Sequence, residues 1–183
     1  MKIGLLSDTH SFLDSKIWKY FKDCDEIWHA GDVGSLKVID EIRSKKKFRG
    51  VYGNIDDNRL RQELPLNQIF EVEDVKVVIT HIGGYPGAYK PRVAELLKQE
   101  KPQLYICGHS HICKASRDQQ LDLLHLNPGA CGNHGFHPVK TIMTFEIKSG
   151  NIDFDEIEVD DPEVAKLLSE TKSLLRDYEN KQE

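Results

Sequence analysis

The sequence predicts an α/β fold in which a largely parallel β-sheet, covered by helices, packs against a second sheet. Residues 1–107 alternate short apolar runs with amphipathic segments, a pattern typical of parallel sheets with helical crossovers. From residue 112 on, the chain changes to successive strand-like runs joined by turns, which predicts the further sheet. With 183 residues, of which 39% are hydrophobic, the chain is long enough to bury one core of ordinary size.

The first part of the chain alternates expected strands and expected helices. Strands are expected at residues 2–6, 26–30, 48–52, 68–74, 75–80 and 103–107. The strands at 68–74 and 75–80 are expected to form a hairpin that turns at Glu73 and Asp74. Helices are expected at residues 14–24, 35–44 and 89–102, with Ser35 as the N-cap of the second and prolines at both ends of the third.

The second part of the chain is expected to be rich in strands. These are expected at residues 112–118, 121–127, 139–148 and 151–159. We therefore expect residues 1–158 to form one domain and residues 159–183 to form a C-terminal helical tail. The apolar residues of the tail share one helical stripe, which fits either a helix on the surface of the domain or self-association into a homo-oligomer.

The composition argues against several classes of function. A net charge of −5 and a pI near 5.9 argue against a nucleic-acid polymer as partner, because such binding usually needs a basic face. The N-terminus reaches Asp8 before a signal-length apolar region develops, and no stretch approaches the roughly 18 apolar residues of a membrane span. We therefore expect a cytoplasmic protein that does not bind membranes. Its four cysteines form no C-x-x-C pair, so we expect reduced, packed thiols rather than a zinc site.

Polar residues follow five of the expected strands at the point where each strand ends. They are Asp8 with His10, Asp32, Asn54, His81, and His109 with His111. Ligands of open α/β sheets bind beyond the carboxyl ends of the strands, so we expect five neighbouring strands to bring these side chains to one edge. Gly31, Gly53 and Gly108 would let the backbone turn sharply at three of these ends.

The residue types at these strand ends are suited to metal binding. Oxygen donors combined with imidazoles, without thiolates, fit Mn, Fe, Zn, Co or Ni rather than a sulfur-rich structural zinc site. The donors are too many for one catalytic ion that must keep an open position, and they suit two ions that share a bridging carboxylate. Two ions roughly 3.5–4 Å apart can hold a hydroxide between them and clamp a phosphoryl group.

The ordered motifs D-x-H, G-D, G-N, H and G-H-x-H resemble those of the calcineurin-like metallophosphoesterase superfamily. The opening MKIGLLSDTH and the later segments GDV, VYGNID, GHSH and LNPG resemble its small bacterial and archaeal phosphodiesterase branch, over about residues 1–155. The resemblance implies a four-layer sandwich of two facing mixed β-sheets flanked by helices, with a dinuclear metal site at the carboxyl ends of the strands. It also implies two divalent ions, manganese first, with iron, zinc or nickel as alternatives.

Carried over position by position, the family pattern implies a set of ligands for each ion and a bridging carboxylate. The first ion would be bound by Asp8, His10 and His111, the second by Asn54, His81 and His109, and Asp32 would bridge the two. Two positions depart from the pattern. Ile55 stands where the broad superfamily often has a histidine that assists catalysis, and Gly83 stands where the branch usually has a second histidine. Acid–base assistance is worth about 10²–10⁴-fold, so we expect a preference for activated leaving groups such as aryl phosphate esters.

Two histidines in the segment NPGACGNHGFH could replace the missing one. The NPG turn lies near the metal site in the resembled family, so we hypothesise that His134 or His137 contacts the substrate phosphate as a catalytic residue. An exposed loop histidine is the alternative. A second candidate for the pocket rim is the segment 83–92, through Tyr85, Tyr89, Lys90 or Arg92, unless it is only a turn that leads into a helix.

Four further residues have two interpretations each. Asp56 and Asp57 either orient Asn54 or a metal-bound water, or cap the short segment that follows them. His29 and His125 lie within apolar strands and are expected to be packed core histidines rather than ligands.

The expected activity is that of a metal-dependent phosphoesterase. We expect a phosphodiesterase that hydrolyses small phosphodiesters with good leaving groups through a metal-bridging hydroxide, while Asn54 and the histidines stabilise the developing charge. One alternative is a catalytically weak metal-binding scaffold or interaction protein of the same fold, which should show eroded ligands. The other is a nuclease or a cyclic-nucleotide phosphodiesterase, and the acidic charge argues against polymeric nucleic acid as its substrate.

Overall fold

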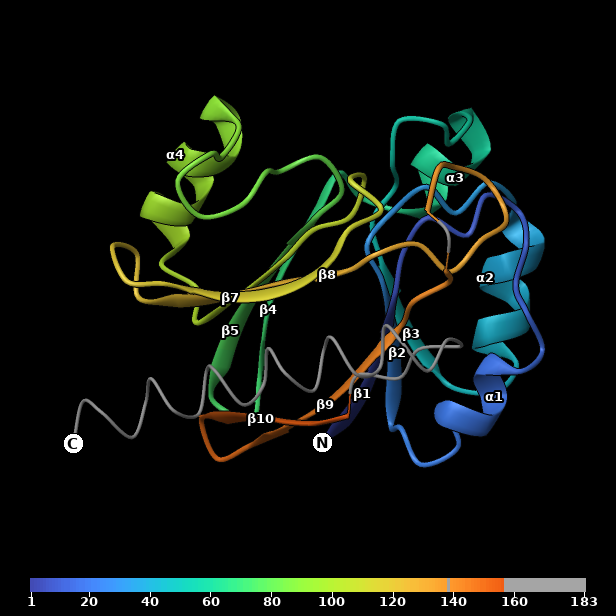
Figure 1. Ribbon diagram of the computed structural model, residues 1–183, viewed down its shortest axis with the longest axis horizontal. Coiled ribbons are helices and arrows are strands. Elements are labelled where there is room, and N and C mark those ends of the chain that lie inside the picture. The colour runs from blue at the N-terminus through green and yellow to red at the C-terminus, as the bar shows by residue number, and fades with distance from the viewer. Residues whose placement is uncertain (138, 157–183) are drawn as a thin grey trace.

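Two five-stranded mixed sheets face each other in the computed structural model, which describes residues 1–137 and 139–156 (Figure 1). The first sheet contains β1 (Lys2–Leu6), β2 (Glu26–His29), β3 (Lys47–Gly50), β9 (Met143–Lys148) and β10 (Asn151–Glu156). Its strand order is β10-β9-β1-β2-β3, with β1, β2 and β3 parallel and β9 and β10 forming an antiparallel pair at one edge.

The second sheet consists of the middle of the chain. It contains β4 (Asn67–Val72), β5 (Val75–Thr80), β6 (Leu104–Ile106), β7 (Cys113–Asp118) and β8 (Leu123–Pro128), in the order β4-β5-β6-β8-β7. Strands β5, β6 and β8 are parallel, and the edge strands β4 and β7 are antiparallel to their neighbours. The expected hairpin is confirmed, since β4 and β5 are joined through Glu73 and Asp74, both at positive φ.

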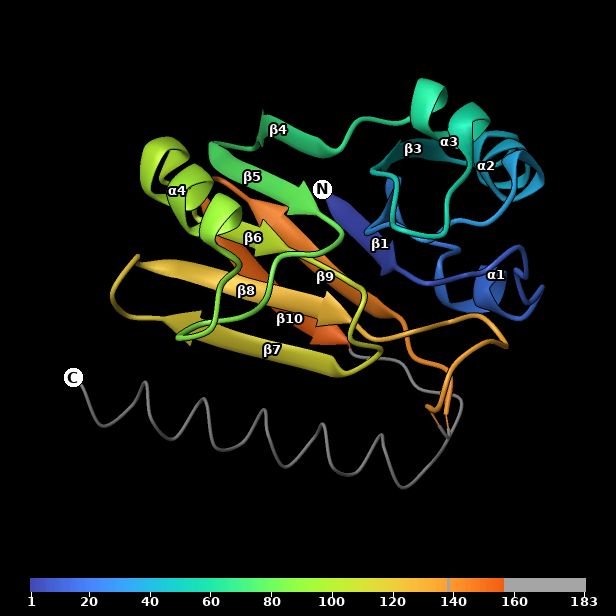
Figure 2. The same cartoon turned by 90° about the horizontal axis from the view of Figure 1, so that it is seen from above.

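Helices cover the two outer faces, so that the fold has four layers (Figures 1 and 2). Helices α1 (Ile17–Tyr20), α2 (Leu36–Arg43) and α3 (Asn58–Glu63) pack on the first sheet, and α4 (Pro91–Glu100) packs on the second. The fold class predicted from the sequence is therefore confirmed. None of these helices has the length and apolar character that crossing a membrane would require.

Alternating side chains along the strands divide the core into three parts. Ile3 and Leu5 of β1 point between the sheets, while Leu6 packs under α1 and α2. In β6, Leu104 and Ile106 pack between the sheets and Tyr105 packs under α4. Because strands with helices on one face and a sheet on the other are buried on both sides, they read in the sequence as continuous apolar runs.

Three expectations need correction. The five strands with polar ends do not belong to one sheet: β1, β2 and β3 lie in the first, and β5 and β6 lie in the second. The helix expected at residues 14–24 contracts to the four residues of α1, because the chain turns after Phe21 and Asp25 already bonds to Lys2 in the first sheet. Ser35 occupies the N-cap of α2, as expected, but its side chain makes no capping hydrogen bond. The expected tail, residues 159–183, lies outside the described residues.

Candidate metal centre

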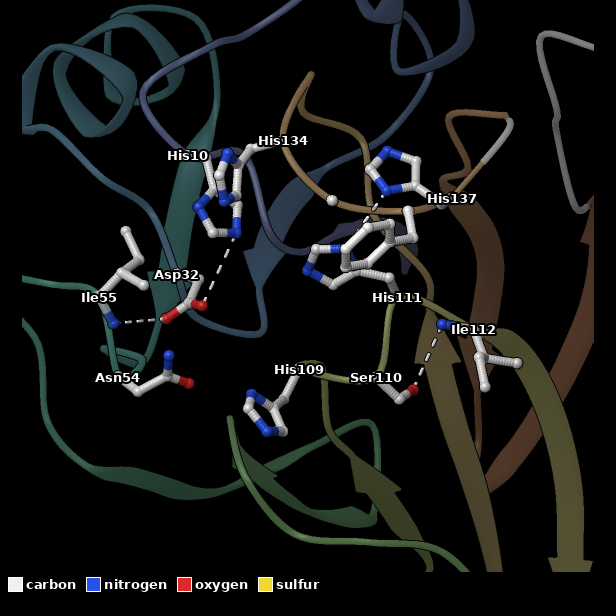
Figure 3. Close-up of a pocket in the computed structure, with 12 residues that line it drawn as sticks. His10, Asp32, Asn54, Ile55, His109, Ser110, His111, Ile112, His134 and His137 are labelled. Carbon is white, nitrogen blue, oxygen red and sulfur yellow. Dashed lines mark hydrogen bonds and ion pairs between the residues drawn. The ribbon is translucent and has the colours of Figure 1, made fainter.

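The polar residues at the five strand ends meet around one cavity of about 700 Å³. Figure 3 shows His10, Asp32, Asn54, His109 and His111 around it, on loops that follow β1, β2, β3 and β6. Two further predicted ligands, Asp8 after β1 and His81 after β5, are buried beneath these side chains. The structure thus brings all seven predicted ligands together, although they come from two sheets.

The acidic and imidazole side chains form two groups, each of which could hold an ion. In the first group, one ligand atom each from Asp8, His10 and His111 lies within 4.8 Å of the others. In the second, the same is true of Asp32, His81 and His109. Asn54 is exposed at the cavity and would supply an amide oxygen. The grouping agrees with the predicted division of ligands, and the role of each residue stays a prediction.

Unpartnered polar atoms show that these residues fit a divalent cation. Within the described part of the chain, three buried side-chain atoms have no hydrogen-bond partner: Oδ1 of Asp8, Nε2 of His10 and Nε2 of His81. Buried polar atoms are normally hydrogen-bonded. Oδ1 of Asp8 also lies 3.1 Å from Nε2 of His111 and 4.0 Å from Nε2 of both His10 and His81. Lone pairs that face one another in this way suit a cation placed among them.

Each of the two aspartates uses one carboxylate oxygen to hold the loops. Oδ2 of Asp8 accepts hydrogen bonds from the Ser7 hydroxyl and from the amide of His109 (3.1 Å). Oδ1 of Asp32 accepts a hydrogen bond from the amide of Ile55 (3.1 Å), while Oδ2 lies 3.7 Å from Nε2 of His10. Asp32 also lies 3.2 Å from Nε2 of His81, so it stands between the two groups, as a bridging ligand must.

The charges at the site favour a positive partner. Burial lowers the pKa of His81, but the carboxylates of Asp32 and Asp8 raise it by more, and it lies above its ordinary value. Asp8 likewise raises the pKa of His111. Burial lowers the pKa of His10, which favours the neutral imidazole that a metal ligand requires. The carboxylates therefore attract positive charge to this position, and a divalent cation would supply it.

His81 is oriented for coordination by its second ring nitrogen. Its Nδ1 lies 2.8 Å from the carbonyl oxygen of Ala30. A carbonyl can only accept, so Nδ1 carries a proton, and in the neutral ring that a metal would bind, the lone pair is on Nε2, which faces Asp8 and Asp32. Ligating histidines commonly have such a partner at the nitrogen that faces away from the metal.

The backbone is strained where the ligands are attached. Five of the predicted ligands have φ between +47° and +68°, a region that residues other than glycine seldom adopt: Asp8, His10, Asp32, His109 and His111. Such conformations cost about 1–3 kcal/mol each and are concentrated at functional sites. Gly53 shows how closely the loops approach, since a Cβ atom there would lie 1.9 Å from Oδ1 of Asp32.

Asp56 and Asp57 differ in role. The buried carboxylate of Asp56 accepts three backbone hydrogen bonds, from Gly34 (2.7 Å), Gly53 (2.8 Å) and Val33 (3.1 Å). It thereby joins the loop that carries Asp32 to the loop that carries Asn54. Asp57 caps α3 instead, through hydrogen bonds from the amides of Arg59 and Leu60 (both 3.0 Å). The capping interpretation is thus confirmed for Asp57, whereas a role of Asp56 in orienting Asn54 or a metal-bound water stays a prediction.

Both candidate loop histidines line the cavity, in different surroundings (Figure 3). His134 is exposed, and its ring lies 4.8 Å from that of His10. His137 has a partner at each ring nitrogen, His111 at Nδ1 and the carbonyl of Gly132 at Nε2. His134 is therefore the one that is free to reach a substrate in this arrangement.

The alternative rim at residues 83–92 does not line the cavity. The hydroxyl of Tyr89 donates to Asp118 (2.7 Å), and Arg92 donates to Asn67 (2.9 Å) and Thr80 (3.1 Å), so these side chains anchor the segment before α4. The sequence did not reveal the apolar part of the rim, Ile112 and Phe136, which are both exposed. The only signal for Phe136 in the sequence is the presence of an apolar residue within a glycine-rich segment.

The two histidines expected in the core are buried, as predicted. His29 accepts a hydrogen bond from the amide of Gly31 (3.1 Å) at Nδ1 and lies 2.9 Å from the hydroxyl of Thr9 at Nε2. His125 lies between the hydroxyl of Ser116 (3.2 Å) and the thiol of Cys107 (3.3 Å). Neither belongs to the two groups of potential ligands.

Comparison with known proteins gives one consistent family. The sequence profile of the calcineurin-like phosphoesterase superfamily domain matches residues 1–166. A probable metallophosphoesterase of Methanocaldococcus jannaschii is 30% identical over 159 residues, which cover 81% of this chain and 77% of that protein. A phosphodiesterase of the same organism is 31% identical over 147 residues, covering 72% of this chain and 84% of that protein. Among solved structures, a novel archaeal phosphodiesterase superposes with a TM-score of 0.69 at 27% identity, covering 87% of this chain and 99% of that chain.

Proposed function

The chain belongs to the calcineurin-like phosphoesterase superfamily and is a metallophosphoesterase; within that class, we propose that it is a phosphodiesterase with two divalent metal ions that hydrolyses small phosphodiesters with good leaving groups. The observation that carries the proposal is the pair of three-residue ligand groups at one cavity, with unpartnered lone pairs facing inward. The proteins named phosphodiesterases among the relatives support the choice of diesters.

Each of the two ligand groups would bind one ion. Asp8, His10 and His111 would hold one ion, Asn54, His81 and His109 would hold the other, and Asp32 would contact both. When bound, the ions would lower the pKa of a coordinated water and offset the negative charge of the diester. Oxygen donors mixed with imidazoles fit manganese, iron, zinc or nickel, and the resemblance to the family puts manganese first.

Protonation of the leaving group depends on His134. Ile55 borders the cavity next to Asn54 and cannot donate a proton, and both ring nitrogens of His137 have partners. His134 is exposed at the cavity, so we propose it as the residue that contacts the phosphate or the leaving group. If it does, His134→Ala should lower kcat most for esters with poor leaving groups. An unchanged kcat across a series of aryl phosphodiesters with different leaving-group pKa values would contradict this role.

The proposed function is tested by hydrolysis across a panel of substrates. The panel contains an aryl phosphodiester, an aryl phosphomonoester, cyclic nucleotides and nucleic acid, each assayed with manganese, nickel, zinc or a chelator. We expect metal-dependent hydrolysis that is fastest for the aryl phosphodiester, and no detectable hydrolysis with the chelator. Preference for nucleic acid or a cyclic nucleotide would favour those alternatives, and absence of hydrolysis throughout would favour the scaffold.

Asp8→Asn is the matched variant for the metal requirement. The amide side chain preserves shape, but it cannot both accept the hydrogen bond from His109 at one position and offer an oxygen to the ion at the other. We therefore expect a folded protein without activity. Substantial hydrolysis by Asp8→Asn protein in the presence of chelator would refute the mechanism.

A further inference from the structure

The rings of His111 and His137 face each other at the edge of the cavity. Their Nδ1 atoms lie 3.2 Å apart, and the dashed line in Figure 3 marks this contact. The opposite nitrogen of His111, Nε2, lies 3.1 Å from Oδ1 of Asp8, within the first ligand group. His111 therefore directs one nitrogen to the proposed ion and the other to His137.

The direction of the hydrogen bond between the rings follows from the contact made by the other ring nitrogen of His137. Its Nε2 lies 3.1 Å from the carbonyl oxygen of Gly132. Because a carbonyl can only accept, Nε2 of His137 carries the proton, and in the neutral ring Nδ1 then has a lone pair. This lone pair accepts from the Nδ1–H of His111, so Nε2 of His111, which faces Asp8, is the nitrogen that would coordinate an ion.

The carbonyl at the end of this chain of bonds is fixed to the segment after β1 that contains Asp8. The amide of Gly132 donates to the carbonyl of Asp8 (3.2 Å), and the amide of Cys131 donates to the carbonyl of Ser7 (3.1 Å). A Cβ atom at Gly132 would lie 2.4 Å from the carbonyl oxygen of Thr9, so the loop is in direct contact with the end of β1. The position of His137 is thereby tied to that of Asp8.

His81 is also linked through Nδ1 to a backbone carbonyl, but without an intervening ring. Its Nδ1 donates directly to the carbonyl of Ala30, while His111 reaches a carbonyl through a second ring. A ring that accepts from one histidine and donates to a carbonyl can fix the tautomer and the orientation of that histidine.

We propose that His137 is a positioning residue that selects the Nδ1–H tautomer of His111 and thereby sets the metal affinity of the group formed by Asp8, His10 and His111. This inference rests on the proposed metal-binding role of His111. It assigns His137 to the support of a ligand rather than to the substrate phosphate, and it gives the loop that ends at His137 a function in metal binding.

Two variants distinguish the effect of the hydrogen-bond acceptor of His137 from the effect of its ring volume. His137→Phe keeps a ring but removes the acceptor, and His137→Asn places an amide oxygen near the position of Nδ1. Loss of such a supporting contact typically lowers metal affinity about 10–100-fold. In Mn²⁺ titrations of the full chain, we expect His137→Phe to weaken one of two sites by that factor and His137→Asn to restore most of the loss. Asn133→Ala, an exposed change in the same loop, should leave both sites and the activity unchanged.

A second readout does not depend on activity. In the Zn²⁺-loaded protein the ion occupies Nε2 of His111, and ¹⁵N NMR spectra report whether the proton on Nδ1 is shared with Nδ1 of His137, through a scalar coupling between the two nitrogens. We expect this coupling in the wild type. Absence of the coupling in the wild type, or wild-type affinity at both sites of folded His137→Phe protein, would overturn the inference. Failure of the proposed function would instead appear as absent hydrolysis with the coupling and the two metal affinities as expected.

Discussion

Asp56 should contribute strongly to the stability of the fold, although it is not one of the predicted metal ligands. Its carboxylate is 3% exposed and accepts three backbone hydrogen bonds, from Val33, Gly34 and Gly53. These amides flank Asp32 and Asn54 in the chain. One side chain therefore holds together two loops that the two metal groups require.

The loss on removing this carboxylate can be estimated from its bonds. Asp56→Ala leaves three amides without their acceptor, at about 1–3 kcal/mol for each buried group. Neighbouring contributions are not additive, so we expect a total of roughly 3–5 kcal/mol, a large part of the 5–15 kcal/mol by which domains are usually stable. Asp56→Asn keeps the volume and one oxygen but turns an NH₂ group toward a backbone donor, so it should lose about half of that amount.

Urea unfolding followed by tryptophan fluorescence measures the free energy of unfolding. The kcat for hydrolysis of an aryl phosphodiester reports whether the metal site is intact. Asp57→Ala is the matched control, because Asp57 is the adjacent acid and caps α3 through two amides. Loss of that cap should cost about 1 kcal/mol and leave kcat unchanged. If the free energy of unfolding of Asp56→Ala lies within 1 kcal/mol of the wild-type value and the variant keeps full activity, the carboxylate does not join the loops in the way we describe.

Two further predictions follow from single contacts. Gly53→Ala places a Cβ atom 1.9 Å from Oδ1 of Asp32, so we expect loss of activity and of metal binding by titration, and wild-type metal affinity in folded Gly53→Ala protein would contradict this contact. Burial holds the pKa of His125 at about 4, below its ordinary 6.5, so the folded state excludes a proton that the unfolded chain binds. The stability that the neutral ring contributes is complete above pH 6.5 and is lost as the pH falls to 4, by about 3 kcal/mol in total. Between pH 7 and pH 4, the free energy of unfolding should therefore depend less steeply on pH in His125→Gln than in the wild type. Equal slopes for the two proteins would refute the assignment.

The local features of this fold could be predicted from the sequence, and the pairing of its strands could not. The apolar runs marked nearly every strand. The turn expected at Glu73 and Asp74 is present, and both residues adopt positive φ there. Which strands share a sheet depends on contacts between distant segments. The parallel pairing of β5 with β6 and of β6 with β8, in a sheet separate from β1 to β3, left no local signal in the sequence.

The candidate site shows the same limit at the level of side chains. Its ligand types followed from the strand ends and the family motifs, since both are read along the chain. The roles of Asp56 and Asp57, and of His134 and His137, were interchangeable in the sequence because each pair is adjacent or shares one loop. Three-dimensional contacts separate them: Asp56 accepts from amides of the loop after β2, and His137 contacts His111.

The two aspartates of the centre explain how strained loops are held while ligand atoms stay free. In Asp8, Oδ2 binds the Ser7 hydroxyl and the amide of His109, and Oδ1 faces the imidazoles. In Asp32, Oδ1 binds the amide of Ile55 and also lies 3.2 Å from Nε2 of His81, and Oδ2 faces His10. Each carboxylate thus ties a residue with positive φ to a second loop and still directs oxygen toward the imidazoles. An amide side chain has a single oxygen, so Asn at either position would turn an NH₂ group toward a backbone amide or toward the ligand nitrogens. Aspartate is therefore required at both positions by the backbone as well as by the metal, which explains why these loops can carry several ligands in conformations that would otherwise be unfavourable.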